Sequence, residues 1–198
     1  DVTDAVLCVD TAKEEVMTEA LQACENPTII NSTKAIEAHL ETYVALATEH
    51  DSGLIALTIN ESGVPSEANA RVEMGAVIAS KAMEGGLPMG DLYIDPVILP
   101  VNVAPKQPAR VMEALGQLKM LSDPSPNFML GLSNVSQGCK ERSLLNRIYA
   151  SMAIGAGLNA LLMDALDQDL MNAVITAEVL MERQLYCDDY ISAYMGSR

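Results

Sequence analysis

The sequence predicts an α/β fold in which short parallel strands alternate with helices and curl into a barrel. Six short apolar runs alternate with longer segments of helical spacing. A polar residue closes each of these runs, and in a parallel β/α barrel the carboxyl ends of the strands form one rim that carries the active site. The closing residues are Asp10, Asn31, Thr58 with Asn60, Asp95, Ser133 with Asn134, and Asp164. One such residue is as often a helix cap or a turn residue, but six together favour a shared pocket.

The first three strand–helix units occupy residues 5–85. Their strands are the apolar runs AVLCVD at 5–10, PTIIN at 27–31 and GLIALTIN at 53–60. Continuous apolar runs are typical of strands that are covered on both faces. The expected helices cover 12–24, 34–49 and 66–85. In the second of these helices Ile36, Leu40 and Val44 recur at four-residue spacing.

The last three units follow the same pattern. Their strands are expected at 91–98, 127–134 and 159–164, and their helices at 107–121, 143–157 and 168–184. Val111, Leu115 and Leu118 give the fourth helix its helical spacing. Proline-rich segments flank this helix and indicate loops on both sides of it.

Strict alternation with right-handed crossovers leaves a barrel or a doubly wound sheet. The barrel is favoured because polar residues mark every strand end rather than one switch point. In addition, no helix opens with a Gly-rich phosphate loop of the GxGxxG or GxxxxGK type. A closed (β/α)8 barrel has eight units, so we expect about six of the eight here, in a single domain spanning 1–198. The chain begins without Met and almost directly with a strand, so we expect either that two units precede it or that the fold is an open fragment.

Composition indicates an aliphatic core and excludes several classes of function. The 198 residues are 49% hydrophobic, but they include one Phe, six Tyr and no Trp. A net charge of −15 argues against a nucleic-acid or acidic-membrane surface. The four cysteines form no CxxC pair, and His39 and His50 fall in or beside one predicted helix, so we expect no metal site. No signal peptide or membrane span is visible, Cys8 is expected to be buried, and a cytoplasmic location is the simplest expectation.

The rim residues are Asp, Asn, Ser and Thr, with no His or Lys among them. Carboxylates accept pairs of parallel N–H donors, and carboxamides both donate and accept. Such a rim suits a flat heterocycle with an amidine-like edge, such as a pterin or guanine. A sugar or carbonyl substrate is the second possibility. Asp10 and Asp95 are also candidates for acid–base work, although binding is the preferred role for both.

Two rim positions call for separate interpretations. Asp164 begins a run of acids with Asp167 and Asp169, and we expect these to serve the first turn of the last helix. Asn134 lies in GLSNVS among small residues that let a substrate approach closely. Its carboxamide can donate a hydrogen bond to a developing charge without losing a proton.

Long segments of the chain resemble the pterin-binding methyltransferases. They are LCVDT, IINST, LTINESGVP, GLPMGDLYIDPVILP, LKMLSDPSPNFMLGLSNVSQGC and LYCDD. The resemblance runs from Asp4 to about Tyr190 and is strongest to methyltetrahydrofolate:corrinoid/iron–sulfur protein methyltransferases of the acetyl-CoA (Wood–Ljungdahl) pathway. It extends to the folate domain of cobalamin-dependent methionine synthase and to dihydropteroate synthase. It implies a (β/α)8 TIM barrel of the pterin-binding (dihydropteroate synthase-like) type, commonly a homodimer.

The resemblance also implies roles for individual residues. Asp10, Asn31 and Asp95 match the family's pterin-binding carboxylates and amide, and Asn134 matches the amide that approaches N5 of the pterin. Gly131 and Ser133 match the strand around that amide. Gln137 and Arg142 lie in the following loop, where the family meets substrate and corrinoid.

The implied reaction moves the N5-methyl group of methyltetrahydrofolate to a cob(I)amide cofactor by direct displacement, or runs in reverse. A corrinoid iron–sulfur protein or another corrinoid protein would carry that cobalamin, so Asn134 is the only expected catalytic residue and no metal binds this chain. The alternative is a pterin-binding module without activity of its own, as part of a methionine-synthase-like or methylated-amine demethylation system.

Overall fold

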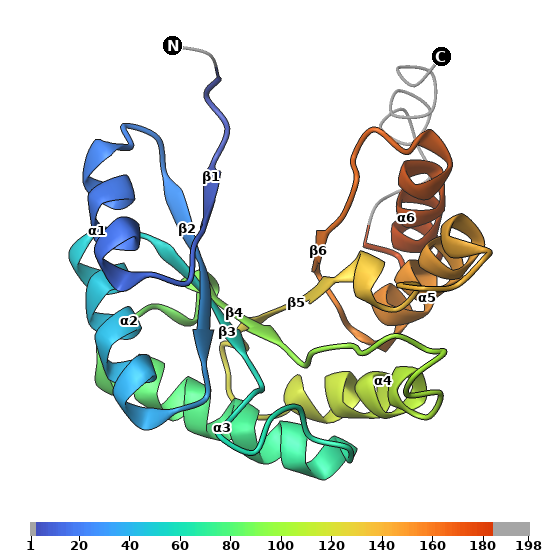
Figure 1. The fold of residues 1–198 in the computed structure, drawn as a ribbon, viewed down its shortest axis with the longest axis horizontal. Coiled ribbons are helices and arrows are strands. Elements are labelled where there is room, and N and C mark those ends of the chain that lie inside the picture. The colour runs from blue at the N-terminus through green and yellow to red at the C-terminus, as the bar shows by residue number, and fades with distance from the viewer. Residues whose placement is uncertain (1–2, 184–198) are drawn as a thin grey trace.

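Six parallel strands form one curved sheet in the computed structural model, which describes residues 3–183 (Figure 1). The strands are β1 (Leu7–Asp10), β2 (Thr28–Lys34), β3 (Gly53–Leu57), β4 (Leu92–Asp95), β5 (Asn127–Gly131) and β6 (Ala160–Leu162). They pair in the order of the sequence, each with the next. Figure 1 shows β1 and β6 standing apart at the two ends of a half-barrel, with the helices outside. The expected partial (β/α)8 barrel with six units is confirmed.

One helix follows each strand, as predicted. The helices are α1 (Glu14–Ala23), α2 (Glu37–Glu49), α3 (Ala68–Glu84), α4 (Gln107–Leu118), α5 (Arg142–Ala156) and α6 (Gln168–Leu180). Short 3-10 turns cover Met89–Asp91 and Leu132–Asn134. Helix α5 ends at Gly157, whose φ of +118° is a left-handed conformation that favours glycine. Cys187, the segment LYCDD and the last expected residue of the helix 168–184 lie outside the described residues.

The strand boundaries differ from the prediction in most of the strands. Strand β4 ends at Asp95 rather than at 98, and β6 ends at Leu162 rather than at 164. Strand β2 continues past Asn31 to Lys34, with a shift of register between Asn31 and Thr33. Strand β3 ends at Leu57, so Thr58 and Asn60 follow it rather than close it. In β5 the extended backbone stops at Gly131, and the residues Leu132–Asn134 that follow it form a 3-10 turn. Apolar runs therefore mark where strands lie but overrun their ends, because loop residues beside the core are also buried.

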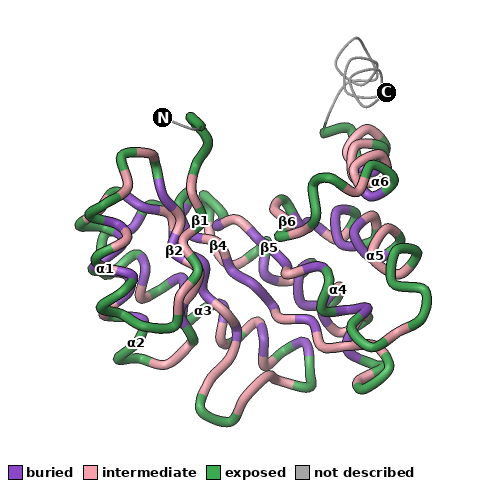
Figure 2. The backbone as a smooth tube through the Cα atoms, turned by 45° about the horizontal axis from the view of Figure 1, so that its top comes forward, coloured by how far each residue is buried: buried purple, intermediate pink, exposed green. Residues whose placement is uncertain are grey.

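The core is aliphatic and lies between the sheet and its helices. It includes Ile30, Leu54, Ile94 and Leu115, all fully buried, with Phe128 as its only phenylalanine. Burial falls toward both edges of the sheet, and Figure 2 shows β1 and β6 largely in the colours of intermediate and exposed residues. Cys8 is exposed and not buried as expected, because β1 is an edge strand. Among residues 3–183, none of the helices combines the length and apolarity needed to cross a bilayer.

Candidate functional site

Strand register places the predicted pterin-binding residues on one face of the sheet. Asp10 pairs with Asn31, Asn31 with Ile55, and Ile55 with Tyr93. Residues paired in adjacent parallel strands point to the same face, and so do residues two apart in one strand. Asp95 lies two residues beyond Tyr93 in β4 and therefore shares this face with Asp10 and Asn31. We call it the inner face, because the helices cover the opposite one.

Asp95 is the buried acid of the inner face, with 8% of its surface exposed. Its Oδ1 accepts a hydrogen bond from the Val97 N–H at 2.7 Å, and its Oδ2 accepts one from the Gly131 N–H at 3.4 Å. Burial raises the pKa of this carboxyl to about 6, although both N–H donors and the charge of Arg71 act in the opposite direction. A carboxylate has about four acceptor positions, so each oxygen keeps one for a ligand.

Asn134 lies beside Gly131, but not at the end of a strand as predicted. It is an exposed residue of the 3-10 turn that follows β5. Its Nδ2 is 3.1 Å from the point that a Cβ on residue 131 would occupy. Gly131, which donates to Asp95, thus also leaves room for the Asn134 amide to fold back over the strand end. The structure brings Asp95, Gly131 and Asn134 to one place.

Ser133 and Gln137 lie in the segment after β5, whereas Arg142 is the first residue of α5 and not a loop residue as predicted. Arg142 donates through Nε to Ser136 Oγ at 3.3 Å and through Nη2 to the Ser133 carbonyl at 3.5 Å, so it supports the loop that carries Asn134. Ser136 is fully buried, whereas Ser133 and Gln137 are exposed. Gln137 is tied to the same loop by its N–H, which donates to the Asn134 carbonyl at 3.2 Å.

Three other polar residues at strand ends have local roles. The Oδ1 of Asn60 accepts from the Ser62 N–H at 2.9 Å, and the Oδ1 of Asp164 accepts from the Leu166 N–H at 2.9 Å. Asp167 caps α6 by accepting from the Leu170 N–H at 3.1 Å. The helix-cap and turn interpretation therefore applies to these positions. Asp167 and Asp169 lie at the start of α6 as expected, whereas Asp164 serves a turn before that helix.

Sequence reasoning missed the buried residues behind Asp95. Arg71 of α3 is fully buried, and its Nε donates to the Pro96 carbonyl at 2.7 Å. Its Nη2 donates to the Val97 carbonyl at 3.3 Å and to Oε1 of Gln107, the first residue of α4. Val97 has a φ of +56°, an unfavourable conformation for a β-branched residue that costs about 1–3 kcal/mol. Local strain of this kind is concentrated at functional sites.

The raised pKa of Asp95 predicts a pH-dependent stability. The protonated carboxyl is favoured in the fold, so the resulting stabilisation is complete below about pH 4 and is lost as the pH rises through about 6. Asp95→Asn carries no charge at either pH. Relative to the wild type, it should gain up to about 3 kcal/mol of unfolding free energy between pH 4 and pH 7.5. Urea denaturation of both proteins at these two pH values measures the difference, and a constant difference would contradict this environment for Asp95.

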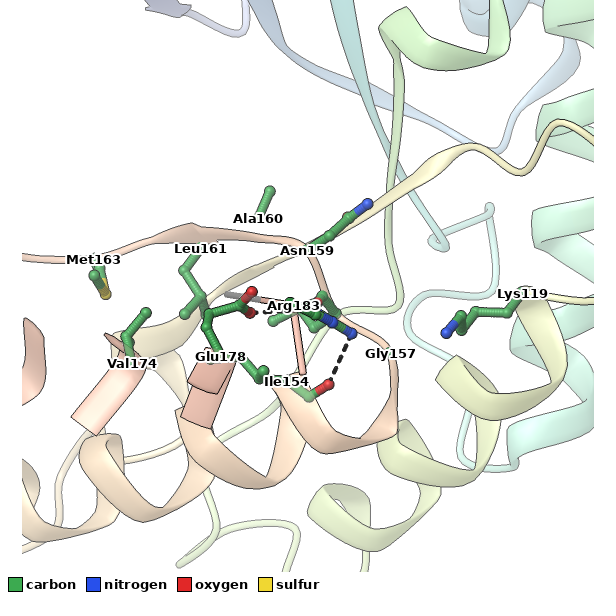
Figure 3. Close-up of a pocket in the computed structure, with 11 residues that line it drawn as sticks. Lys119, Ile154, Gly157, Asn159, Ala160, Leu161, Met163, Val174, Glu178 and Arg183 are labelled. Atoms are coloured by element: carbon green, nitrogen blue, oxygen red, sulfur yellow. Dashed lines mark hydrogen bonds and ion pairs between the residues drawn. The ribbon is translucent and has the colours of Figure 1, made fainter. Parts of the chain in front are cut away.

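A cavity of about 550 Å³ lies elsewhere, at the amino end of β6 (Figure 3). Its polar lining includes Lys119, Asn159, Glu178 and Arg183. Arg183 donates to the Leu158 carbonyl at 2.6 Å and to the Ile154 carbonyl at 3.0 Å, and it pairs with Glu178 at 3.1 Å. Because the inner-face acids lie at the carboxyl ends of their strands, this cavity is separate from the candidate site.

Two known proteins are similar to this chain in sequence. The chain is 21% identical over 196 residues to a methylcorrinoid:tetrahydrofolate methyltransferase from Eubacterium limosum, an alignment that covers 98% of this chain and 72% of that protein. It is 26% identical over 171 residues to a methionine synthase from Mycobacterium tuberculosis, covering 80% of this chain and 14% of that protein.

A solved structure is similar in fold, and a family model matches most of the chain. The dihydropteroate synthase of Yersinia pestis superposes with a TM-score of 0.65 at 17% identity, covering 91% of this chain and 74% of that one, which shows a shared barrel fold. The family model described as pterin binding enzyme matches residues 1–164, which include β1 to β6 and every predicted site residue. The chain belongs to the family of pterin-binding enzymes.

Proposed function

We propose that this chain transfers the N5-methyl group between methyltetrahydrofolate and the corrinoid cofactor of a partner protein. The observation that carries the proposal is the position of Gly131, whose N–H donates to the Asp95 carboxylate and whose missing side chain leaves room for the Asn134 amide. The similarity to a methylcorrinoid:tetrahydrofolate methyltransferase supports the choice of methyl transfer among the reactions of the family.

The inner face has the chemistry that a pterin needs. The Asp95 carboxylate can accept the ring N–H and the exocyclic amine of the pterin as a pair, while Asp10 and Asn31 bind the same ring from β1 and β2. One strand, β3, separates β2 from β4, which places those two strands about 10 Å apart. A two-ring heterocycle can bridge this distance. Asp95 has a pKa of about 6 and is mostly ionised at neutral pH, as an acceptor of two N–H donors must be.

The proposed chemistry is a displacement at the methyl carbon. The Co(I) nucleophile supplies the electron pair of the new Co–C bond, and the electrons of the broken N–C bond stay on N5, which takes up a proton. The Asn134 amide is placed to donate a hydrogen bond to N5 and so to stabilise the departing electrons. Asn134 does not lose a proton, and the reverse transfer uses the same contact.

The exposed loop after β5 supports the proposal of a corrinoid protein as partner. Ser133 and Gln137 are exposed on this loop next to Asn134, and Arg142 holds its backbone. A partner that presents cobalt to the methyl group has to approach at this side of Asn134. A homodimer remains part of the proposal by resemblance.

The alternative is a pterin-binding module with no activity of its own. The match to methionine synthase covers only 14% of that protein, so a chain of this kind occurs as one part of a larger enzyme. A binding module needs Asp95 and Asn31 but has no need of an amide donor at N5.

A methyl-transfer assay distinguishes the two functions. The full chain is mixed with methyltetrahydrofolate labelled with ¹⁴C in the methyl group and with photoreduced cob(I)alamin, and labelled methylcobalamin is counted after single turnovers. We expect transfer that scales with protein concentration, and transfer back to tetrahydrofolate from methylcobalamin. Binding of methyltetrahydrofolate by calorimetry without transfer in either direction would support the binding module instead.

A further inference from the structure

A buried arginine lies behind the candidate site and contacts its backbone. Arg71 is completely buried in α3, where it donates to the carbonyls of Pro96 and Val97 at 2.7 and 3.3 Å. A third hydrogen bond, at 3.4 Å, reaches the carbonyl of Glu67 in the preceding turn. A buried guanidinium is costly to desolvate unless its donors are satisfied. Two of the four hydrogen-bond partners of Arg71, the carbonyls of Pro96 and Val97, belong to the segment that follows Asp95.

Gln107 holds the guanidinium from the other side. Its Oε1 accepts from Nη2 of Arg71, and its Nε2 donates to the carbonyls of Pro65 and Ser66 at 3.5 and 3.4 Å. Gln107 is itself 8% exposed. The amide therefore links the guanidinium to the segment before α3, which fixes the position of Arg71 between α3 and α4.

The Asp95–Val97 turn is held from both sides. The Val97 N–H donates to Asp95 Oδ1 at 2.7 Å, while its carbonyl accepts from Arg71. The left-handed φ of Val97 is the conformation that allows both contacts, and it is unfavourable for valine unless the surroundings maintain it. Without Arg71, the turn would have no side-chain donor on its carbonyl side, and the N–H would no longer be held toward the carboxylate.

We propose that Arg71, held by Gln107, is a positioning residue that fixes the orientation and charge state of the Asp95 carboxylate for pterin binding. The pterin part of this statement rests on the proposed function. The charged and titratable groups that face Asp95 are Arg71 from α3 and Tyr149 from α5, whose hydroxyl donates to the Pro108 carbonyl at 3.4 Å. Glu67 acts on Arg71 from the same helix.

Electrostatics support the same role. Burial raises the pKa of Asp95, and the Arg71 charge together with the two N–H donors limits that rise. Removing the guanidinium removes both the charge and the support of the Val97 N–H. The pKa of Asp95 should then rise further, and the fraction ionised at pH 7 should fall. A purely structural arginine that only packs α3 against α4 would lower stability without changing this pKa.

The test uses Arg71→Met, Arg71→Lys and Gln107→Leu in the full chain, with Arg110→Met as the control. Arg110 is a partly exposed arginine of α4 that pairs with Glu67 and Glu113. Carboxyl ¹³C NMR over pH 4–9 gives the pKa of Asp95, and calorimetry gives the Kd for methyltetrahydrofolate. We expect Arg71→Met to raise this pKa and to weaken binding at pH 7 by about tenfold or more. Arg71→Lys keeps the charge and should be intermediate, and Arg110→Met should match the wild type.

The results test the positioning role of Arg71 separately from the proposed function. A folded Arg71→Met with an unchanged Asp95 pKa and unchanged Kd overturns the positioning role. If Arg71→Met does not fold, Gln107→Leu and Arg71→Lys decide in the same way, since each leaves part of the network in place. If Asp95→Asn binds methyltetrahydrofolate as well as the wild type, the proposed function fails, and the shift of the Asp95 pKa in the Arg71 variants still tests the positioning.

Discussion

Replacing Asn134 by Ala should slow methyl transfer by roughly 10²–10³-fold while changing the Kd for methyltetrahydrofolate far less. The amide is held over Gly131 and is proposed to donate to N5 only as the N–C bond breaks. An interaction made in the transition state affects kcat more than ground-state binding. Single-turnover transfer to cob(I)alamin gives the rate, and calorimetry gives the Kd.

The control for this variant is Asn26→Ala. Asn26 donates through Nδ2 to the carbonyls of Thr3 and Ala5 at 2.9 and 3.0 Å, just before β2 and away from the strand ends that carry the site. The Asn26→Ala variant therefore loses amide hydrogen bonds that serve only the structure. It should melt at a lower temperature than the wild type but transfer methyl groups at a normal rate. An Asn134→Ala protein that is destabilised but transfers methyl at the wild-type rate would assign Asn134 to loop structure alone.

Asp95→Ala should raise the Kd for methyltetrahydrofolate roughly 30- to 150-fold, which corresponds to about 2–3 kcal/mol. The substitution removes the acceptor of two ligand N–H groups, and those donors are then buried without a partner. It also leaves the N–H groups of Val97 and Gly131 unpaired, so some loss of stability accompanies it. Calorimetry at a temperature well below the melting transition separates the two effects.

Asp91→Ala is the matched control, since it removes the same charge from the other end of β4. Asp91 is exposed in the 3-10 turn before the strand. Long-range electrostatics would make the two variants alike, whereas a direct contact with the pterin affects only Asp95→Ala. Equal affinities for both variants and the wild type would remove Asp95 from the binding site.

The fold was predictable because its determinants are local. Each strand is a short apolar run, and each is followed by a helix with apolar residues at helical spacing, as in Val111, Leu115 and Leu118. The ends of the strands were not predictable in the same way. Leu132 is buried after the strand has ended at Gly131, so the hydrophobic pattern continues into a turn. A hydrophobic run indicates buried residues, and residues can remain buried beyond the last hydrogen bond between two strands.

The site was predictable in its residue types but not in its arrangement. Polar residues after apolar runs pointed to Asp95 and Asn134, yet the same signal also marked Asn60 and Asp164, which serve turns. The sequence does not distinguish a carboxylate that binds its own loop from one that keeps acceptor positions free. That distinction depends on the neighbouring strand, because Gly131 of β5 is what donates to Asp95 of β4.

Arg71 was not among the predicted site residues because it lies in a helix and not at a strand end. A signal was nevertheless present, since the buried face of α3 includes Ala68, Gly75, Ile78 and Ala82, and position 71 falls on it. A charged residue on the apolar face of a helix indicates a buried polar network. Two of its partners are the backbone carbonyls of Pro96 and Val97, which no pattern of side chains marks.

The most direct measurement is a crystal structure of the full chain with methyltetrahydrofolate. We expect the pterin on the inner face, with its N–H donors on the Asp95 carboxylate, its ring bridging toward Asp10 and Asn31, and N5 within hydrogen-bond reach of the Asn134 amide. A pterin bound away from Asp95, for example in the cavity beside Arg183 in Figure 3, would contradict it.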